Sequence, residues 1–103
     1  MGASEFFTTS SGKSVKEAFR SAVESAQYEY GHGGYTGTIA EKDEYKSASS
    51  QEFENRDAAI EFAQQKMDDP EHWCNDKWGA AAYVSFKNKD GNMKFLFFGW
   101  ASD

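Results

Sequence analysis

Two runs of strand-forming residues near the C-terminus show the clearest pattern of apolar and polar positions. Residues 80–86 and 94–100 are rich in Ala, Val, Tyr, Phe and Trp, and a polar stretch that contains Asp90-Gly91 separates them. Glycine readily takes the positive φ that a tight turn needs, so this pattern predicts a β-hairpin.

Both faces of the predicted hairpin are apolar, because successive side chains of a strand point to opposite faces. We expect the first face to pack under helices. The second face must be covered by the 31–53 segment, by a second copy of the chain or by a partner. The first face holds Val84, Phe86, Phe95 and Phe97, and the second holds Tyr83, Leu96, Phe98 and Trp100.

The first helix is predicted over residues 15–30. Ser14 and Glu17 form a capping-box pattern at its start, and Gly31 suits the left-handed position that ends it. Its inward residues recur at steps of three and four. They are Val15, Ala18, Phe19, Ala22, Val23, Ala26 and Tyr30.

The second helix is predicted from Asn55, its N-cap, to about Asp68. Asp69 and Pro70 can start a further helical turn that delivers the chain to the hairpin at Trp78. The inward residues of the second helix are Ala59, Ile60, Ala63 and Met67.

Three further strand-forming stretches complete the predicted fold: residues 4–9, a short β-prone run within the glycine-rich segment 31–40, and the polar stretch 45–53, which suits a sheet edge. The element order is therefore β-α-β-(β)-α-β-β in one domain over residues 1–103. This order predicts an α+β fold with two helices on one face of a mainly antiparallel sheet of four to five strands. In that arrangement Phe19, Val23, Ile60 and Ala63 pack against the first hairpin face.

Composition and charge narrow the class of protein. A single cysteine excludes an internal disulfide, and the absence of a signal segment or a long apolar run predicts a soluble cytoplasmic protein without membrane contact. The net charge is −6, and residues 41–76 alone carry −7. This field opposes nucleic-acid binding and favours a partner with a basic surface.

A glycine-rich stretch follows the first helix. The spacing from Gly31 does not fit the dinucleotide fingerprint, and no Lys-Ser or Lys-Thr follows as in a P-loop. A helix cap with a tight turn explains most of this stretch, and a loop for a small anionic ligand or nucleotide is the alternative. The residues of that alternative site are His32, Gly33, Gly34, Tyr35 and Thr36.

No catalytic residue, metal site or cofactor is predicted. His72 and Cys74 are two residues apart, which matches no common zinc pattern and does not bring them together on a helix. The carboxylates of residues 41–76 are numerous, but nothing selects two of them as acid and base, so a solvated acidic face is the simpler interpretation.

Three stretches carry a resemblance to known sequences: residues 28–32, residues 34–39 and residues 77–81. Through these stretches, about a third of the chain resembles a group of small proteins encoded by bacteriophages and mobile bacterial DNA. The resemblance implies a prokaryotic or phage-infected cell and, for such accessory proteins, binding to a host protein. It supplies no catalytic residue.

The sequence as a whole therefore predicts a small acidic protein-binding module, not an enzyme. We expect it to act as a phage-type accessory protein or host-defence inhibitor through its acidic 41–76 face. Self-association as a homodimer is compatible with the second apolar face. The expected partner-binding residues are Glu41, Asp43, Glu44, Glu52, Glu54, Asp57, Tyr83, Phe98 and Trp100.

Overall fold

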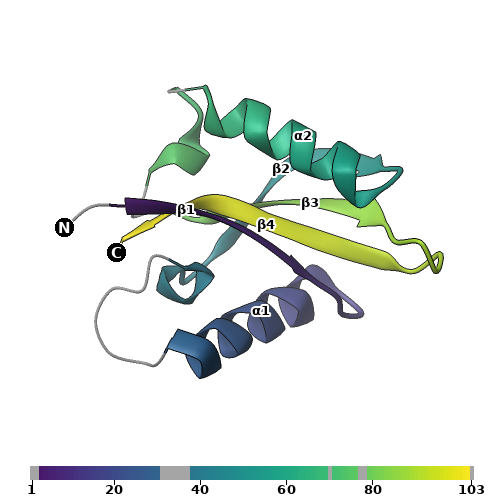
Figure 1. Ribbon diagram of the computed structural model, residues 1–103, viewed down its shortest axis with the longest axis horizontal. Coiled ribbons are helices and arrows are strands. Elements are labelled where there is room, and N and C mark those ends of the chain that lie inside the picture. The colour runs from purple at the N-terminus through teal and green to yellow at the C-terminus, as the bar shows by residue number, and fades with distance from the viewer. Residues whose placement is uncertain (1–2, 31–37, 70, 77–78, 103) are drawn as a thin grey trace.

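The fold contains one sheet with a helix on each side (Figure 1). The computed structural model describes residues 3–30, 38–69, 71–76 and 79–102. Within these residues the predicted α+β class, both long helices and the C-terminal hairpin are confirmed. The elements are β1 (Ala3–Ser10), α1 (Val15–Tyr30), the 3-10 helix η1 (Ile39–Glu41), β2 (Tyr45–Phe53), α2 (Arg56–Met67), the 3-10 helix η2 (Trp73–Asn75), β3 (Ala81–Lys87) and β4 (Met93–Ser102).

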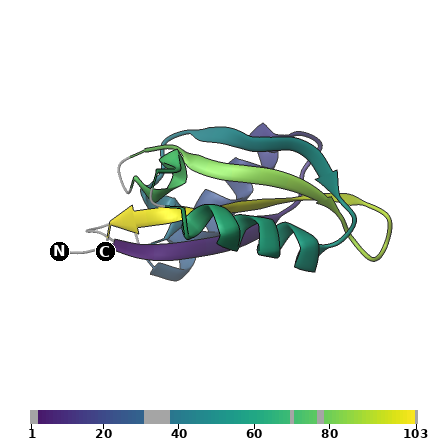
Figure 2. The same cartoon turned by 90° about the horizontal axis from the view of Figure 1, so that it is seen from above.

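The four described strands form a mixed sheet in the order β1-β4-β3-β2. Strand β4 pairs antiparallel with both β1 and β3, whereas β2 pairs parallel with β3 (Figure 2). The polar strand β2 lies at an edge of the sheet, as its sequence predicts. Helix α2 connects the parallel pair, because two parallel strands need a crossover rather than a tight turn.

The predicted N-caps of both long helices are confirmed. The backbone N–H of Glu17 donates to Ser14 Oγ at 3.4 Å, and the backbone N–H of Ala58 donates to Asn55 Oδ1 at 2.8 Å. Each cap satisfies one of the N–H groups that the first turn of a helix leaves without an intrahelical acceptor.

The two helices lie on opposite faces of the sheet, so the prediction that both cover one face is wrong (Figure 1). Helix α1 packs through Ala18 and Ala22 against one face, and α2 packs through Ala59 and Ala63 against the other. Both sheet faces carry large apolar side chains, and each face therefore gains hydrophobic stabilisation from a helix of its own.

The predicted division of hairpin side chains between the two faces is also wrong. The structure pairs Lys87 with Met93 and Val84 with Leu96, so Val84 lies on the same face as Leu96 and not on the face of Phe95 and Phe97. A shift of one residue in register exchanges the faces of one strand relative to the other. Val84, Phe86, Leu96 and Phe98 therefore lie under α2, while Ala81, Tyr83, Phe95 and Phe97 lie on the α1 face.

The predicted core contacts are correct for individual pairs but not as one cluster. Phe97 is fully buried and meets Phe19 of α1, with ring centroids 5.5 Å apart. Val84 and Phe86 instead share a cluster with Ile60 and Ala63 of α2. The sheet thus separates two cores, and its α1 face forms one wall of the candidate site.

Candidate functional site

The structure divides the predicted acidic face between the two ends of strand β2. Glu41, Asp43 and Glu44 precede the strand, whereas Glu52 and Glu54 lie at its far end. The two ends of β2 pair with Ala81 and Phe86 of β3, and these five residue steps correspond to about 17 Å at roughly 3.3 Å for each step. This separation exceeds the Debye length of about 8 Å in physiological salt, so the two groups do not act as one charged surface. Asp57 follows the second group at the start of α2.

Asp76 joins the group of carboxylates that precedes β2, because Lys42 contacts its backbone. The backbone N–H of Ala81 donates to the Glu44 carbonyl at 2.9 Å, and this contact places the 41–44 segment beside the start of β3. The side chain of Asn75 donates to the Lys66 carbonyl at 3.2 Å and so holds η2 against the C-terminal end of α2. The surface that these contacts assemble, here termed the acidic end, contains Glu41, Asp43, Glu44 and Asp76.

A buried lysine holds the acidic end together. Lys42 is only 4% exposed, and its Nζ donates to the carbonyls of Gly79 at 2.9 Å and Asp76 at 3.3 Å. Burial lowers the pKa of the Lys42 ammonium, and the nearby Asp76 carboxylate opposes this effect. Lys42 therefore links η1 to the segment that leads into β3.

The predicted aromatic surface of Tyr83, Phe98 and Trp100 does not exist as one face. Phe98 is fully buried under α2, and Tyr83 points to the α1 side of the sheet. Trp100 lies on the α2 side, where its Nε1 donates to Asn75 Oδ1 at 2.8 Å. The register shift in the hairpin causes this separation.

A different aromatic surface is present on the α1 face. The rings of Phe19 and Tyr45 have centroids 4.9 Å apart, Tyr45 and Tyr83 follow at 5.9 Å, and Tyr83 and Phe95 at 6.1 Å. All four side chains are only half-buried, although Phe19 of α1 contacts Tyr45 at the start of the edge strand β2. We call these four residues the aromatic row.

A groove of about 400 Å³ lies between α1 and the start of β2, beside the aromatic row. Its apolar part is formed by Phe19, Val23 and Tyr45, and charged side chains border it. Two bases come from the first half of α1, whereas the acidic Asp43 belongs to the acidic end. The residues that line the groove are Lys16, Phe19, Arg20, Val23, Glu24, Asp43 and Tyr45.

Of these groove residues, the sequence pattern indicates only Asp43 as a partner contact. Phe19 and Val23 have the periodicity of core residues, and Tyr45 is the first residue of a polar edge strand. Their half-exposure depends on how far α1 lies from β2. The sequence pattern alone does not predict the distance between α1 and β2.

His72 and Cys74 lie close together but have structural roles. The backbone N–H of Cys74 donates to His72 Nδ1 at 3.1 Å, which caps η2. Burial raises the pKa of the Cys74 thiol to about 11 and lowers the pKa of His72. The thiol is therefore protonated at neutral pH, and this pair is not arranged as an activated nucleophile and its base.

The alternative ligand-binding loop lies outside the described residues, with its members His32, Gly33, Gly34, Tyr35 and Thr36. Within the described part of the chain, no group of three or more His, Cys, Asp or Glu side chains could hold a metal ion. Neither described helix is long and apolar enough to cross a membrane.

Comparisons with known proteins add no relative. No protein-family model matches the chain, and neither curated proteins nor solved structures give a match. The candidate site therefore has to be interpreted from its own geometry.

Proposed function

We propose that the chain is a non-enzymatic protein-binding module whose groove beside α1 receives an extended segment of a partner protein. The segment would insert an aliphatic or aromatic side chain between Val23 and Tyr45. The observation that carries this proposal is the aromatic row, which remains half-exposed next to a groove of about 400 Å³. Aromatic side chains that line a concave surface are typical of the residues that dominate binding energies at protein interfaces.

The apolar part of the groove can supply most of the binding energy. Complete burial of a leucine or phenylalanine side chain contributes about 1.5–3 kcal/mol relative to its exposure to water. The rings of Phe19 and Tyr45 are already fixed by mutual contact. Binding therefore loses less side-chain entropy than it would with freely rotating groups.

The groove lining is balanced in charge, with Lys16 and Arg20 beside Glu24 and Asp43, so the preference for a basic segment comes from the acidic end and from the net charge of −6. Glu24 and Asp43 border the groove, and Asp43 continues into the acidic end. A partner with Lys or Arg next to its apolar anchor would pair with these carboxylates, and the net charge of −6 would accelerate its approach. The expectation of a basic partner is thus retained, with the acidic end replacing the continuous 41–76 face.

The biological setting is part of the proposal. The resemblance to proteins encoded by phages and mobile DNA suggests a prokaryotic cytoplasm and a host protein as partner. A segment displayed on the surface of such a protein would meet the groove without any rearrangement of the sheet.

A displayed library of random peptides tests the proposal even though the partner is unidentified. We expect enrichment of peptides that combine an aromatic or aliphatic residue with Lys or Arg. Val23→Glu should weaken their binding roughly tenfold or more, because the new carboxylate must lose water when the apolar anchor enters. Asp43→Lys should reduce the association rate, chiefly at low salt.

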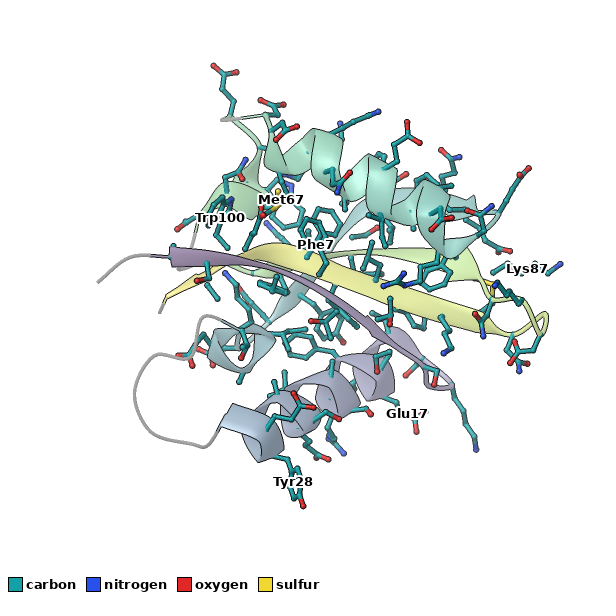
Figure 3. The ribbon with its side chains drawn as sticks, viewed as in Figure 1. Phe7, Glu17, Tyr28, Met67, Lys87 and Trp100 are labelled. Atoms are coloured by element: carbon teal, nitrogen blue, oxygen red, sulfur yellow. The ribbon has the colours of Figure 1, made fainter. Side chains whose placement is uncertain are left out.

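Tyr28→Ser is the matched control on the same helix. Tyr28 is 92% exposed and points away from the sheet (Figure 3), so its replacement should change neither binding nor the melting temperature. Circular dichroism must show that Val23→Glu keeps its helix content. Peptides that bind the Val23→Glu and Asp43→Lys variants as well as they bind the parent would refute the groove as the binding site. A homodimer that Val23→Glu dissociates would assign the groove to a second copy of the chain instead.

A further inference from the structure

A second cavity lies where the first turn of α2 meets the turn between β3 and β4. Its volume is about 220 Å³. It is separate from the groove, with which it shares no lining residue. The side chains that line it are Asn55, Arg56, Asp57, Lys87, Asn88 and Lys89.

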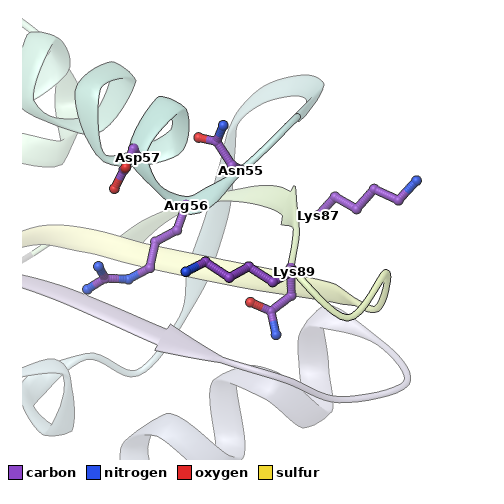
Figure 4. Close-up of a pocket in the computed structure, with 6 residues that line it drawn as sticks. Asn55, Arg56, Asp57, Lys87 and Lys89 are labelled. Carbon is purple, nitrogen blue, oxygen red and sulfur yellow. The ribbon is translucent and has the colours of Figure 1, made fainter.

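The lining of this cavity is basic, although the chain as a whole is acidic. It contains three cationic side chains and one carboxylate. Figure 4 shows Arg56 and Lys89 extending to the same side below the start of α2, whereas the ammonium of Lys87 extends away from them. Among the residues that the structure describes, none of these three cations forms an ion pair. Two convergent positive charges are therefore available to a ligand.

We propose that this cavity binds the phosphate group of a small ligand, either inorganic phosphate or a phosphomonoester. The planar guanidinium of Arg56 can donate two parallel hydrogen bonds to phosphate oxygens, and Lys89 adds a compact positive charge. Asn55 Oδ1 accepts from the backbone N–H of Ala58, and the NH₂ group of the same amide remains as a neutral donor in the lining of the cavity. Helix α2 begins here, and its partial positive charge acts in the same direction as the cations.

The lining also limits what else the ligand can carry. None of the six side chains is aromatic, so the cavity offers no surface on which a nucleobase could stack. A volume of about 220 Å³ corresponds to roughly seven water molecules at about 30 Å³ each. This space suits a phosphate group with a short polar substituent.

Removing the charge of Asp57 should change the phosphate affinity in the opposite direction to removing a cation. Its carboxylate lines the cavity with the cations, so it repels a bound phosphate dianion. Asp57→Asn should therefore strengthen phosphate binding, whereas Arg56→Gln and Lys89→Gln should each weaken it roughly tenfold, as expected for loss of a charge-assisted hydrogen bond. Arg56, Asp57 and Lys89 are all exposed, so these substitutions should leave the fold intact.

The experiment is a titration of the ¹⁵N-labelled chain with sodium phosphate, followed by amide chemical shifts at constant ionic strength. We expect saturable shifts confined to residues 55–57 and 87–89. Sulfate and chloride are titrated in the same way, as competing anions. Glycerol 3-phosphate, which carries a short polar substituent, distinguishes the two ligand sources in a parallel titration, because tighter binding than phosphate indicates a phosphomonoester and weaker binding indicates the free ion. Lys46→Gln is the control for general charge, since Lys46 is an exposed lysine near the other end of β2.

Each outcome of this titration decides the proposal. Saturation that Arg56→Gln weakens and Asp57→Asn strengthens, with Lys46→Gln unchanged, supports it. Shifts that chloride reproduces at the same ionic strength overturn it, as do shifts that Lys46→Gln weakens as much as Arg56→Gln does. The absence of any shift at residues 55–57 and 87–89 also overturns it.

Discussion

Replacing Lys42 by methionine should destabilise the protein even though it removes a buried charge. The methionine side chain has similar length but cannot donate to the carbonyls of Asp76 and Gly79, to which Lys42 Nζ donates at 3.3 and 2.9 Å. A hydrogen bond from a charged group contributes about 1.5–3 kcal/mol. Because the variant also avoids the cost of burying the ammonium, we expect a net loss of about 1–3 kcal/mol in the free energy of unfolding.

The pH dependence of this loss gives a sharper test than its size. Burial lowers the pKa of folded Lys42 below the ordinary value of 10.5, so the unfolded chain retains this proton to higher pH than the folded protein does. The free energy of unfolding must then rise with pH through the window that ends near 10.5. Methionine does not titrate, and the advantage of the parent over Lys42→Met should therefore widen as the pH increases through that window.

Urea denaturation followed by tryptophan fluorescence measures both quantities. The parent, Lys42→Met and Lys46→Met should be compared at several pH values, since other titrating groups are shared and cancel in the differences. Lys46 is exposed, so Lys46→Met should cost less than Lys42→Met. A constant or narrowing advantage of the parent over Lys42→Met would refute the argument that burial dominates the lysine environment.

Two further experiments test the two cores. Phe97→Ala should reduce the free energy of unfolding by about 3–5 kcal/mol, because Phe97 is fully buried. Phe7→Ala, at a partly exposed position of the edge strand, should cost much less in the same urea assay. Equal costs for the two variants would contradict the assigned faces. Native Cys74 should react with iodoacetamide far more slowly than the urea-unfolded chain at mildly alkaline pH, since its thiol is buried with a pKa of about 11. Equal reaction rates in the native and unfolded states would show that the thiol is accessible.

The negative charge of residues 41–76 can be read from the sequence, whereas the basic cavity depends on the fold. Residues 41–76 carry most of the negative charge, and this excess is visible from composition alone. The strand β2 then separates the two groups of carboxylates, and the fold brings Arg56 from this acidic stretch to Lys89 of the hairpin turn. Net charge along a segment therefore predicts a preferred kind of partner, but not the surface on which it acts.

The elements themselves were determined by local sequence. Helix α1 follows from the Ser14 cap and a regular apolar stripe, α2 from Asn55, and the hairpin from Asp90-Gly91. These signals involve residues close together in the chain, so no distant contact is needed to produce them. The α+β class follows directly from them, whereas residues 39–41 form a 3-10 helix and not part of an additional short strand.

Only the tertiary structure decided which faces meet. The hairpin pairs Val84 with Leu96 and Ala82 with Phe98, and because side chains alternate along a strand, this register places Leu96 and Phe98 on the side of Val84. With two apolar faces to cover, α1 and α2 pack on opposite sides, and α1 leaves Tyr45 and Tyr83 half-exposed. The groove depends on these long-range contacts, for which the linear pattern of apolar and polar residues contains no signal.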